Sequence, residues 1–136
     1  MQRQLHLNLF IHSRGHHEAS WRHPDASPLP LTDIRYYTDL ARRAEKGLFD
    51  SVFLADSLAL GEDAGRAARS WLEPVTSLTA MAMATEHIGL IGTCSTTYTE
   101  PFNLARQFAS LDHISNGRAG WNIVTSWSVP AVSYTH

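Results

Sequence analysis

The chain has 136 residues, of which 43% are hydrophobic, and a formal net charge of −2 at pH 7. This length favours a single domain, and the scattered arginines argue against nucleic acid or an anionic membrane as a partner. The single cysteine, Cys94, excludes an internal disulfide, and no apolar run is long enough to span a membrane, so we expect a cytoplasmic protein without a secretory leader.

The N-terminal third is expected to contain a strand, a loop and a helix. Residues 5–11 alternate and then become continuously apolar, which predicts a strand buried at its C-terminal half. Residues 12–31 hold four histidines, two arginines and three prolines, which favours an irregular but ordered functional loop. Thr32 or Asp33 is expected to cap the following helix, and Gly47 is the residue expected just past its end.

The remaining chain alternates between short apolar strands and helices. We expect strands at residues 51–56, 88–93 and 119–126, and helices from Pro74 to the Glu86–His87 pair and from Pro101 to the Asn116–Gly117 turn. Residues 57–73 are expected to form a loop. This β-α-β-α-β-α-β order implies a parallel sheet with right-handed crossovers.

Two architectures fit that order. One is an open doubly wound sheet, and the other is the N-terminal half, about four βα units, of a (β/α)8 TIM barrel. A G-x-G-x-x-G motif does not follow the first strand, which disfavours the dinucleotide-binding version of the open sheet.

Polar residues mark the C-terminal ends of the expected strands, where both architectures bind ligands. Hydroxyl, amide and carboxylate groups without a paired activating base suit hydrogen bonding to a polar heterocycle and a phosphate better than hydrolysis. The candidates are Asp56, Thr93, Asn122 and Ser126. A purely structural role remains open for each: Asp56 as a loop cap, Thr93 bonding to the backbone, Asn122 in a cross-strand amide bond and Ser126 in a turn.

Other reactive residues have competing interpretations. The histidines of residues 12–23 suggest a zinc hydrolase, but their spacing lacks the H-E-x-x-H pattern. Cys94 has no evident base beside it and is expected to be a small buried apolar residue rather than a nucleophile. Trp121 is expected in the core or the barrel wall.

Several motifs together resemble the luciferase-like flavin monooxygenases, specifically the branch that includes nitrilotriacetate, dibenzothiophene-sulfone and long-chain alkane monooxygenases. The fourth-strand motif is the most specific of them. The motifs are Gly-His-His-Glu-Ala (15–19), Trp-Arg-His-Pro (21–24), Phe-Leu-Ala-Asp (53–56), Ser-Thr-Thr-Tyr-x-x-Pro-Phe (95–102), Ala-Arg (105–106), Ser-Leu-Asp-His-Ile-Ser (110–115) and Gly-Arg-Ala-Gly-Trp-Asn-Ile-Val-Thr-Ser (117–126).

The resemblance implies a TIM-barrel enzyme that uses O2 and reduced FMN, supplied by a separate reductase, to oxygenate a small organic substrate. It implies FMN contacts from Asp56, Thr93 and Ser126, with Asn122 near the flavin and His16 and His17 near the flavin or substrate. It leaves the catalytic residues unassigned, implies no metal, and is compatible with a homo-oligomer.

The resemblance covers residues 5–127, and the C-terminal residues depart from it. We therefore expect a partial barrel domain over residues 1–127 and an atypical tail over residues 128–136. As an N-terminal fragment, the chain would be inactive alone. The alternative is a non-catalytic truncated fragment that needs a partner chain to fold.

Overall fold

The computed structural model describes residues 4–58 and 71–125. Within these ranges the strands are β1 (Asn8–Ile11), β2 (Ser51–Leu54), β3 (Gly89–Ser95) and β4 (Ala119–Val124). The helices are α1 (Ile34–Lys46), α2 (Pro74–Ala82) and α3 (Pro101–Ser115), with a short 3-10 helix η1 (Ser20–Arg22) in the loop after β1. The predicted alternation of strands and helices is confirmed.

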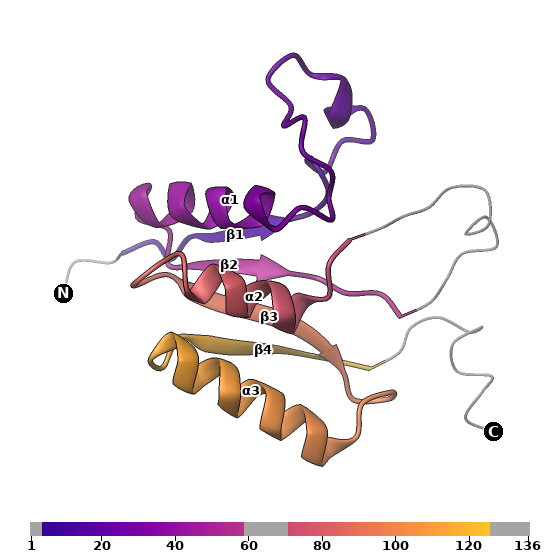
Figure 1. Cartoon of the computed structure of the whole chain (residues 1–136), viewed down its shortest axis with the longest axis vertical. Helices are drawn as coiled ribbons and strands as arrows, with labels where there is room; N and C mark the ends of the chain where they lie inside the picture. Colours follow the sequence, from indigo (N-terminus) through magenta and orange to yellow (C-terminus); the bar gives the residue numbers. More distant parts are fainter. Residues whose placement is uncertain (1–3, 59–70, 126–136) are drawn as a thin grey trace.

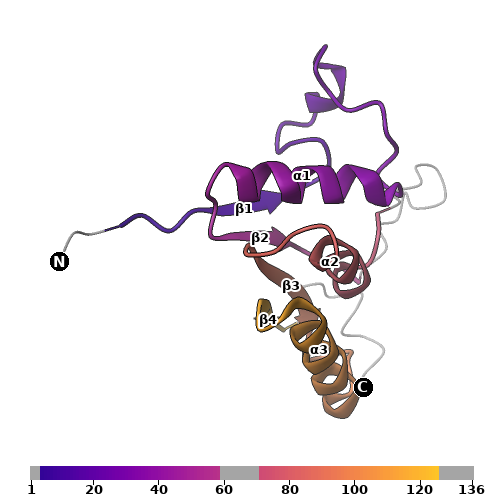
Figure 2. The ribbon, with the colours of Figure 1, turned by 60° about the vertical axis from the view of Figure 1, so that its left-hand side comes forward.

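The strands pair in sequence order, β1-β2-β3-β4, and every pairing is parallel. Figures 1 and 2 show α1, α2 and α3 along the same face of the sheet. A doubly wound sheet would reverse its strand order and carry helices on both faces. The observed order is instead that of the first units of a (β/α)8 barrel, in which helices cover the outside and the other face lines the interior.

The core lies between the sheet and the helices. Val52 and Leu90 on the strands, and Leu78 and Met81 on α2, have no measurable exposure. Gly92 allows α2 to approach β3, because a Cβ atom at this position would lie 2.8 Å from Leu78 Cδ1. The helix-facing side of the sheet therefore carries most of the apolar packing.

Local chemistry explains where the helices begin. The Asp33 carboxylate accepts a hydrogen bond from the Arg35 N–H and caps α1, as predicted. Pro74 occupies the first turn of α2, also as predicted, and the Glu73 carboxylate accepts bonds from the N–H groups of Val75 and Thr76.

The helix ends differ in part from expectation. Gly47 has φ −80°, and Leu48 takes the left-handed conformation instead with φ 60°, so that the Phe49 N–H bonds back to the Ala44 carbonyl. The α2 helix stops at Ala82 rather than near Glu86–His87. The α3 helix ends at the Asn116–Gly117 turn, as predicted, and Asn116 takes the left-handed conformation there.

The strands are also shifted from their expected bounds. The first begins at Asn8 rather than residue 5, the second and fourth end two residues early, at Leu54 and Val124, and the third extends to Ser95. Ladder pairing with a neighbouring strand, rather than apolar character, sets these limits.

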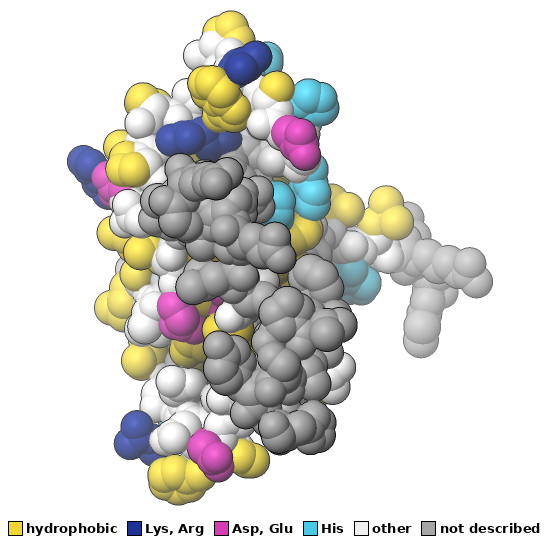
Figure 3. Space-filling model, turned by 90° about the vertical axis from the view of Figure 1, so that its right-hand side faces the viewer, with side chains coloured by type: hydrophobic (Ala, Val, Ile, Leu, Met, Phe, Trp, Pro, Cys, Tyr) yellow, Lys and Arg dark blue, Asp and Glu magenta, His cyan; other side chains and the backbone are white. Residues whose placement is uncertain are grey.

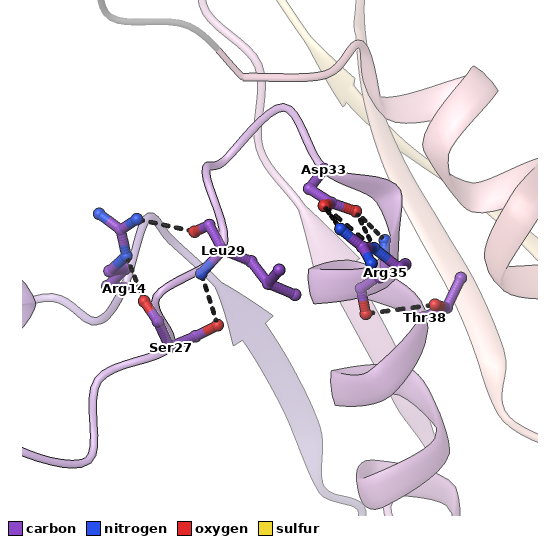
Figure 4. A network of polar contacts seen from close by, with 6 residues as sticks. All are labelled: Arg14, Ser27, Leu29, Asp33, Arg35 and Thr38. Carbon is purple, nitrogen blue, oxygen red and sulfur yellow. Dashed lines mark hydrogen bonds and ion pairs between the residues drawn. The ribbon is translucent and has the colours of Figure 1, made fainter.

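The loop between β1 and α1 projects from one end of the sheet (Figure 1). Arg14 fixes its base by donating from Nε to the Ser27 carbonyl at 3.0 Å and from Nη2 to the Leu29 carbonyl at 2.7 Å (Figure 4). The Tyr36 hydroxyl on α1 donates to the Ser13 carbonyl at 2.8 Å. These bonds order the loop, as its composition predicted.

At the other end of the sheet, two charged side chains hold the connections together. Arg118 donates from Nε to the Ser115 carbonyl at 2.7 Å, and its other nitrogens donate to Thr85 Oγ1 and to the carbonyls of Ala82, Thr85 and Ile88 at 2.9–3.0 Å. Glu45 Oε1 accepts from three successive backbone N–H groups, at residues 86–88, over 2.6–3.0 Å.

Candidate functional site

The face of the sheet opposite the helices presents a distinct set of side chains. Gly92 faces α2, so its neighbours in β3, Ile91 and Thr93, face the other way. Residues paired in register share a face, which places Phe10 and Phe53 beside Ile91, and Asn122 beside Thr93. We call this the open face; side chains from all four strands lie on it.

Thr93 and Asn122 form a polar pair on the open face. The Asn122 Nδ2 donates to Thr93 Oγ1 at 2.9 Å, and Thr93 is only 3% exposed. A cross-strand amide bond is one of the roles expected for Asn122, and the structure shows it. Among residues 4–58 and 71–125, no further hydrogen bond involves the Asn122 amide oxygen or the Thr93 hydroxyl proton.

Asp56 lies at the same end of the sheet, two residues beyond Leu54, which pairs with Gly92. Its carboxylate accepts a bond from the Ser57 N–H at 2.8 Å, the loop-capping role expected of it. Burial raises the pKa of Asp56, the Ser57 N–H opposes that rise, and the charge on Glu73 adds to it. Within residues 4–58 and 71–125, no hydrogen bond joins Asp56 to the Thr93–Asn122 pair.

Cys94 is unsuited to nucleophilic chemistry. Burial, and then the charges on Glu73 and Asp56, raise the pKa of its thiol to about 11. The thiolate, which is the reactive form, is therefore scarce at neutral pH. This agrees with the expectation of an inert cysteine, although the side chain is half-buried rather than fully enclosed.

Four aromatic rings form a cluster at the C-terminal end of β1 and β2. The Phe10 and Phe53 rings lie 4.9 Å apart, and the Phe10 ring meets His16 edge-on at 4.9 Å and His12 at 5.6 Å. The two imidazoles stack, with centroids 5.0 Å apart and an interplanar angle of 20°. Figure 3, which looks onto the C-terminal end of the strands, shows histidines gathered on the side of the projecting loop.

Of the two histidines expected near flavin or substrate, only His16 joins this cluster. His17 instead accepts a hydrogen bond on Nδ1 from the Ala19 N–H at 3.1 Å, so it shapes its own loop. His12, Phe10 and Phe53 were not singled out as site residues from the sequence. The signal that could have found the phenylalanines is the alternation of strand residues, which puts both on the face opposite the buried core positions.

The histidines do not converge as metal ligands. His12 and His16 meet ring against ring, and His23 accepts the Asp25 N–H on Nδ1 at 3.2 Å. In the part of the chain that the structure describes, no group of three or more histidine, cysteine or acidic residues is arranged to hold a metal ion. The zinc-hydrolase alternative gains no support from this geometry.

Three expectations fall outside the described residues. Ser126, expected to contact FMN, belongs to residues 126–136, as do the domain boundary after residue 127 and the tail at 128–136. The end of β4 is bonded to the residue that follows β3: the Thr96 N–H and hydroxyl donate to the Val124 carbonyl at 2.9 and 3.2 Å.

On the helix-covered side of the sheet, the described residues line a small cavity. A cavity of about 190 Å³ lies between α2 and α3 and includes Glu73, Thr76 and Arg106 in its lining. Trp121 faces this side; it is 38% exposed, packs 5.8 Å from Phe108, and donates from Nε1 to the Cys94 carbonyl, so it is part of the wall. Among the described residues, no helix is both long and apolar enough to cross a bilayer.

The sequence model of the luciferase-like monooxygenases matches residues 6–134. The chain belongs to this family. It is 52% identical over 125 residues to N-acetyl-S-(2-succino)cysteine monooxygenase of Bacillus subtilis (strain 168), covering 92% of the chain and 28% of that relative. It is 51% identical over 136 residues to nitrilotriacetate monooxygenase component A of Aminobacter aminovorans, covering 91% of the chain and 30% of that relative.

Solved structures confirm the barrel architecture of this luciferase-like chain. A long-chain alkane monooxygenase superposes with a TM-score of 0.85 at 37% identity, covering 98% of the chain and 33% of that structure. EDTA monooxygenase from Chelativorans sp. BNC1 gives 0.83 at 32% identity, with 98% and 32% coverage. A riboflavin lyase solved with modified FMN and riboflavin gives 0.81 at 30% identity, with 98% and 32% coverage. The chain thus spans about a third of the relatives it matches.

Proposed function

We propose that the chain is the N-terminal part of a monooxygenase that uses reduced FMN, delivered by a separate reductase, and O2 to oxygenate a small organic substrate. The observation that supports this most directly is the open face, where the Thr93–Asn122 pair stands beside the apolar surface of Ile91, Phe53 and Phe10. Polar groups beside apolar surface fit a cofactor that has a flat aromatic ring and several hydrogen-bonding atoms.

The residues present fit a flavin in their chemistry. Thr93 and Asn122 offer a hydroxyl and an amide that hydrogen-bond without reacting, and the thiol of Cys94 is held protonated. Asp56 and Ser126 complete the proposed contacts. When bound, the flavin supplies the electrons for O2 activation, and the protein binds it, orients it and excludes water. The name of one relative as a component A supports a separate reductase.

Flavin binding by the purified chain tests this proposal. We expect FMN fluorescence to be quenched on titration with the chain and the affinity to fall about tenfold or more in Thr93→Ala or Asn122→Ala, since each loses a hydrogen-bonding group. Thr38→Ala and Asn103→Ala, which remove the same side chains from a half-buried position on α1 and an exposed position on α3, are the matched controls. Failure to bind oxidised or reduced FMN, both alone and together with the βα units that complete the barrel, would reject the proposal.

We also propose that further βα units complete the barrel, from the same polypeptide or from a partner. The support is apolar exposure at both edges: Leu5 beside β1 is 87% exposed, Ile123 on β4 is 63% exposed and Phe102 on α3 is 76% exposed. Such side chains and open strand edges favour association. Size-exclusion chromatography and thermal melting decide this, because a compact monomer with a cooperative melt would contradict it.

A further inference from the structure

We propose that His12 and His16 form a subsite that binds a carboxylate group of the substrate, so that this enzyme acts on a polycarboxylate. The proposal rests on the monooxygenase function proposed above and adds the chemical class of its substrate. It starts from the stacked imidazoles at the C-terminal end of β1, which belong to no other network in the described structure.

The two imidazoles are fixed in place by aromatic contacts rather than by their nitrogens. Phe10 meets both rings edge-on, and Phe53 packs against Phe10 from the neighbouring strand. In residues 4–58 and 71–125, no hydrogen bond involves a ring nitrogen of His12 or His16, and both residues are exposed. An imidazole carries at least one N–H donor in either protonation state, so the pair presents neighbouring unused donors.

The other histidines of the loop provide the contrast. His17 and His23 each accept a backbone N–H on Nδ1, at 3.1 and 3.2 Å, so their rings serve the loop itself. Arg14, at the loop base, uses Nε and Nη2 on the Ser27 and Leu29 carbonyls. The loop is therefore stabilised by its own hydrogen bonds, and the rings of His12 and His16 are available to a ligand.

The N–H donors around the pair favour an acceptor-rich ligand. Residues 12–31 hold four histidines and two arginines against two carboxylates, Glu18 and Asp25. N–H donors on two rings whose centroids lie 5.0 Å apart suit the oxygens of a carboxylate group or of two carboxylates on one molecule. An alkane or a sulfide has no acceptor that would use them.

The pair also lies where a substrate would sit beside the proposed flavin. Phe10 and Phe53 share the open face with the Thr93–Asn122 pair, so the imidazoles and the flavin-binding groups border one surface. The names of two relatives more than half identical to this chain denote substrates with several carboxylates. The names support a polycarboxylate as the substrate class, and the imidazole pair identifies the residues of this chain that would bind its carboxylates.

The test uses propane-1,2,3-tricarboxylate and its neutral triamide as probes, followed by histidine-selective NMR and calorimetry on the full chain. We expect the acid to shift the imidazole signals of His12 and His16 but not those of His23, and to bind at least about tenfold more tightly than the triamide. The double variant His12→Phe, His16→Phe keeps the ring stack but removes the donors, and should abolish this preference. His23→Phe is the matched control and should retain it.

FMN titration of the same samples separates the two proposals. Unchanged FMN affinity in the double variant, together with loss of the acid preference, supports the subsite. Equal binding of acid and triamide by the unsubstituted chain, or an undiminished preference in the double variant, overturns the subsite whatever the FMN result. If FMN does not bind but the acid preference is observed, the monooxygenase proposal is overturned. The preference for the tricarboxylate is then judged from the probe experiment by itself.

Discussion

Asn122 Nδ2 donates to Thr93 Oγ1 across the β3–β4 pair at 2.9 Å, and Thr93 is 3% exposed. This bond joins two residues that lie 29 positions apart in the chain. It satisfies a buried hydroxyl while fixing the orientation of the amide. Removing one partner leaves the other without its bond, so the two side chains are coupled in stability as well as in the proposed flavin contact.

A double-mutant cycle should measure that coupling. Thr93→Val keeps the shape of the side chain and removes the hydroxyl, and we expect a loss of about 1–3 kcal/mol in the free energy of unfolding because the amide loses its partner. Asn122→Leu made in the Thr93→Val background should cost less than it does alone, measured by urea denaturation. Strictly additive losses would show that the bond contributes nothing.

Arg118 is expected to be the most sensitive arginine outside the proposed site. Its guanidinium donates to five oxygens, from the last residues of α2 and α3 and from the segment that follows α2, so Arg118→Ala leaves several carbonyls without a donor. We expect a loss of about 2–4 kcal/mol in the free energy of unfolding. Arg106→Ala, on the exposed side of α3, is the matched control and should change it by less than about 0.5 kcal/mol. Equal effects from the two variants would contradict this role.

Glu45 predicts a dependence of stability on acid. Burial favours a higher pKa for this carboxyl, but the N–H groups of residues 86–88 outweigh it and lower the pKa below its ordinary value of 4.5. A carboxyl whose pKa is depressed in the folded state stabilises the fold above its unfolded pKa, and that contribution is lost as the pH falls through the folded pKa. Glu45→Gln should therefore flatten the acid limb of the melting temperature between pH 7 and 3. An unchanged acid limb would show that other carboxyls dominate it.

Cys94 should react slowly with alkylating agents. Its pKa is raised from 9.0 to about 11, so the thiolate fraction of the folded chain is about 100-fold smaller than that of an ordinary cysteine at pH 7.5. Iodoacetamide labelling followed by mass spectrometry should be slow in buffer and fast in urea. Rapid labelling of the folded chain at pH 7.5 would refute the shifted pKa.

Gly92→Ala should weaken the contact between β3 and α2. The added methyl would lie 2.8 Å from Leu78 Cδ1, so the leucine must move within a packed core, and we expect a loss of about 1–3 kcal/mol in the free energy of unfolding. Pairing the change with Leu78→Val makes room for the methyl and should recover part of the loss. If the single variant is as stable as the original chain, α2 can move away from β3 at this position without loss of stability.

The parallel architecture could be read from the sequence because local signals agree with one another. Asp33 and Pro74 mark helix starts, and the apolar runs around Val52 and Leu90 are too short for helices. The choice between barrel and doubly wound sheet could not be made from alternation alone, since it depends on strand order. The family resemblance favoured the barrel, and the sequential order confirms it.

The site was predictable only in part. Strand ends identify Thr93 and Asn122 as candidates, but their mutual bond depends on the register between β3 and β4, which no local pattern specifies. The His12–His16 stack arises because the loop folds back over Phe10, a contact set by the whole loop. Leu48, rather than Gly47, adopts the left-handed conformation at the end of α1. This conformation lets the Phe49 N–H donate to the Ala44 carbonyl.

The two faces of the sheet place different demands on the sequence. Positions such as Val52 and Leu90 are enclosed by helices, whereas Phe10, Phe53 and Ile91 on the open face remain partly exposed. Within this chain, substitutions on the open face remove less buried apolar area than substitutions on the helix-facing side. In a complete barrel the same positions would line the packed interior, so their tolerance to substitution should fall once the remaining βα units are present.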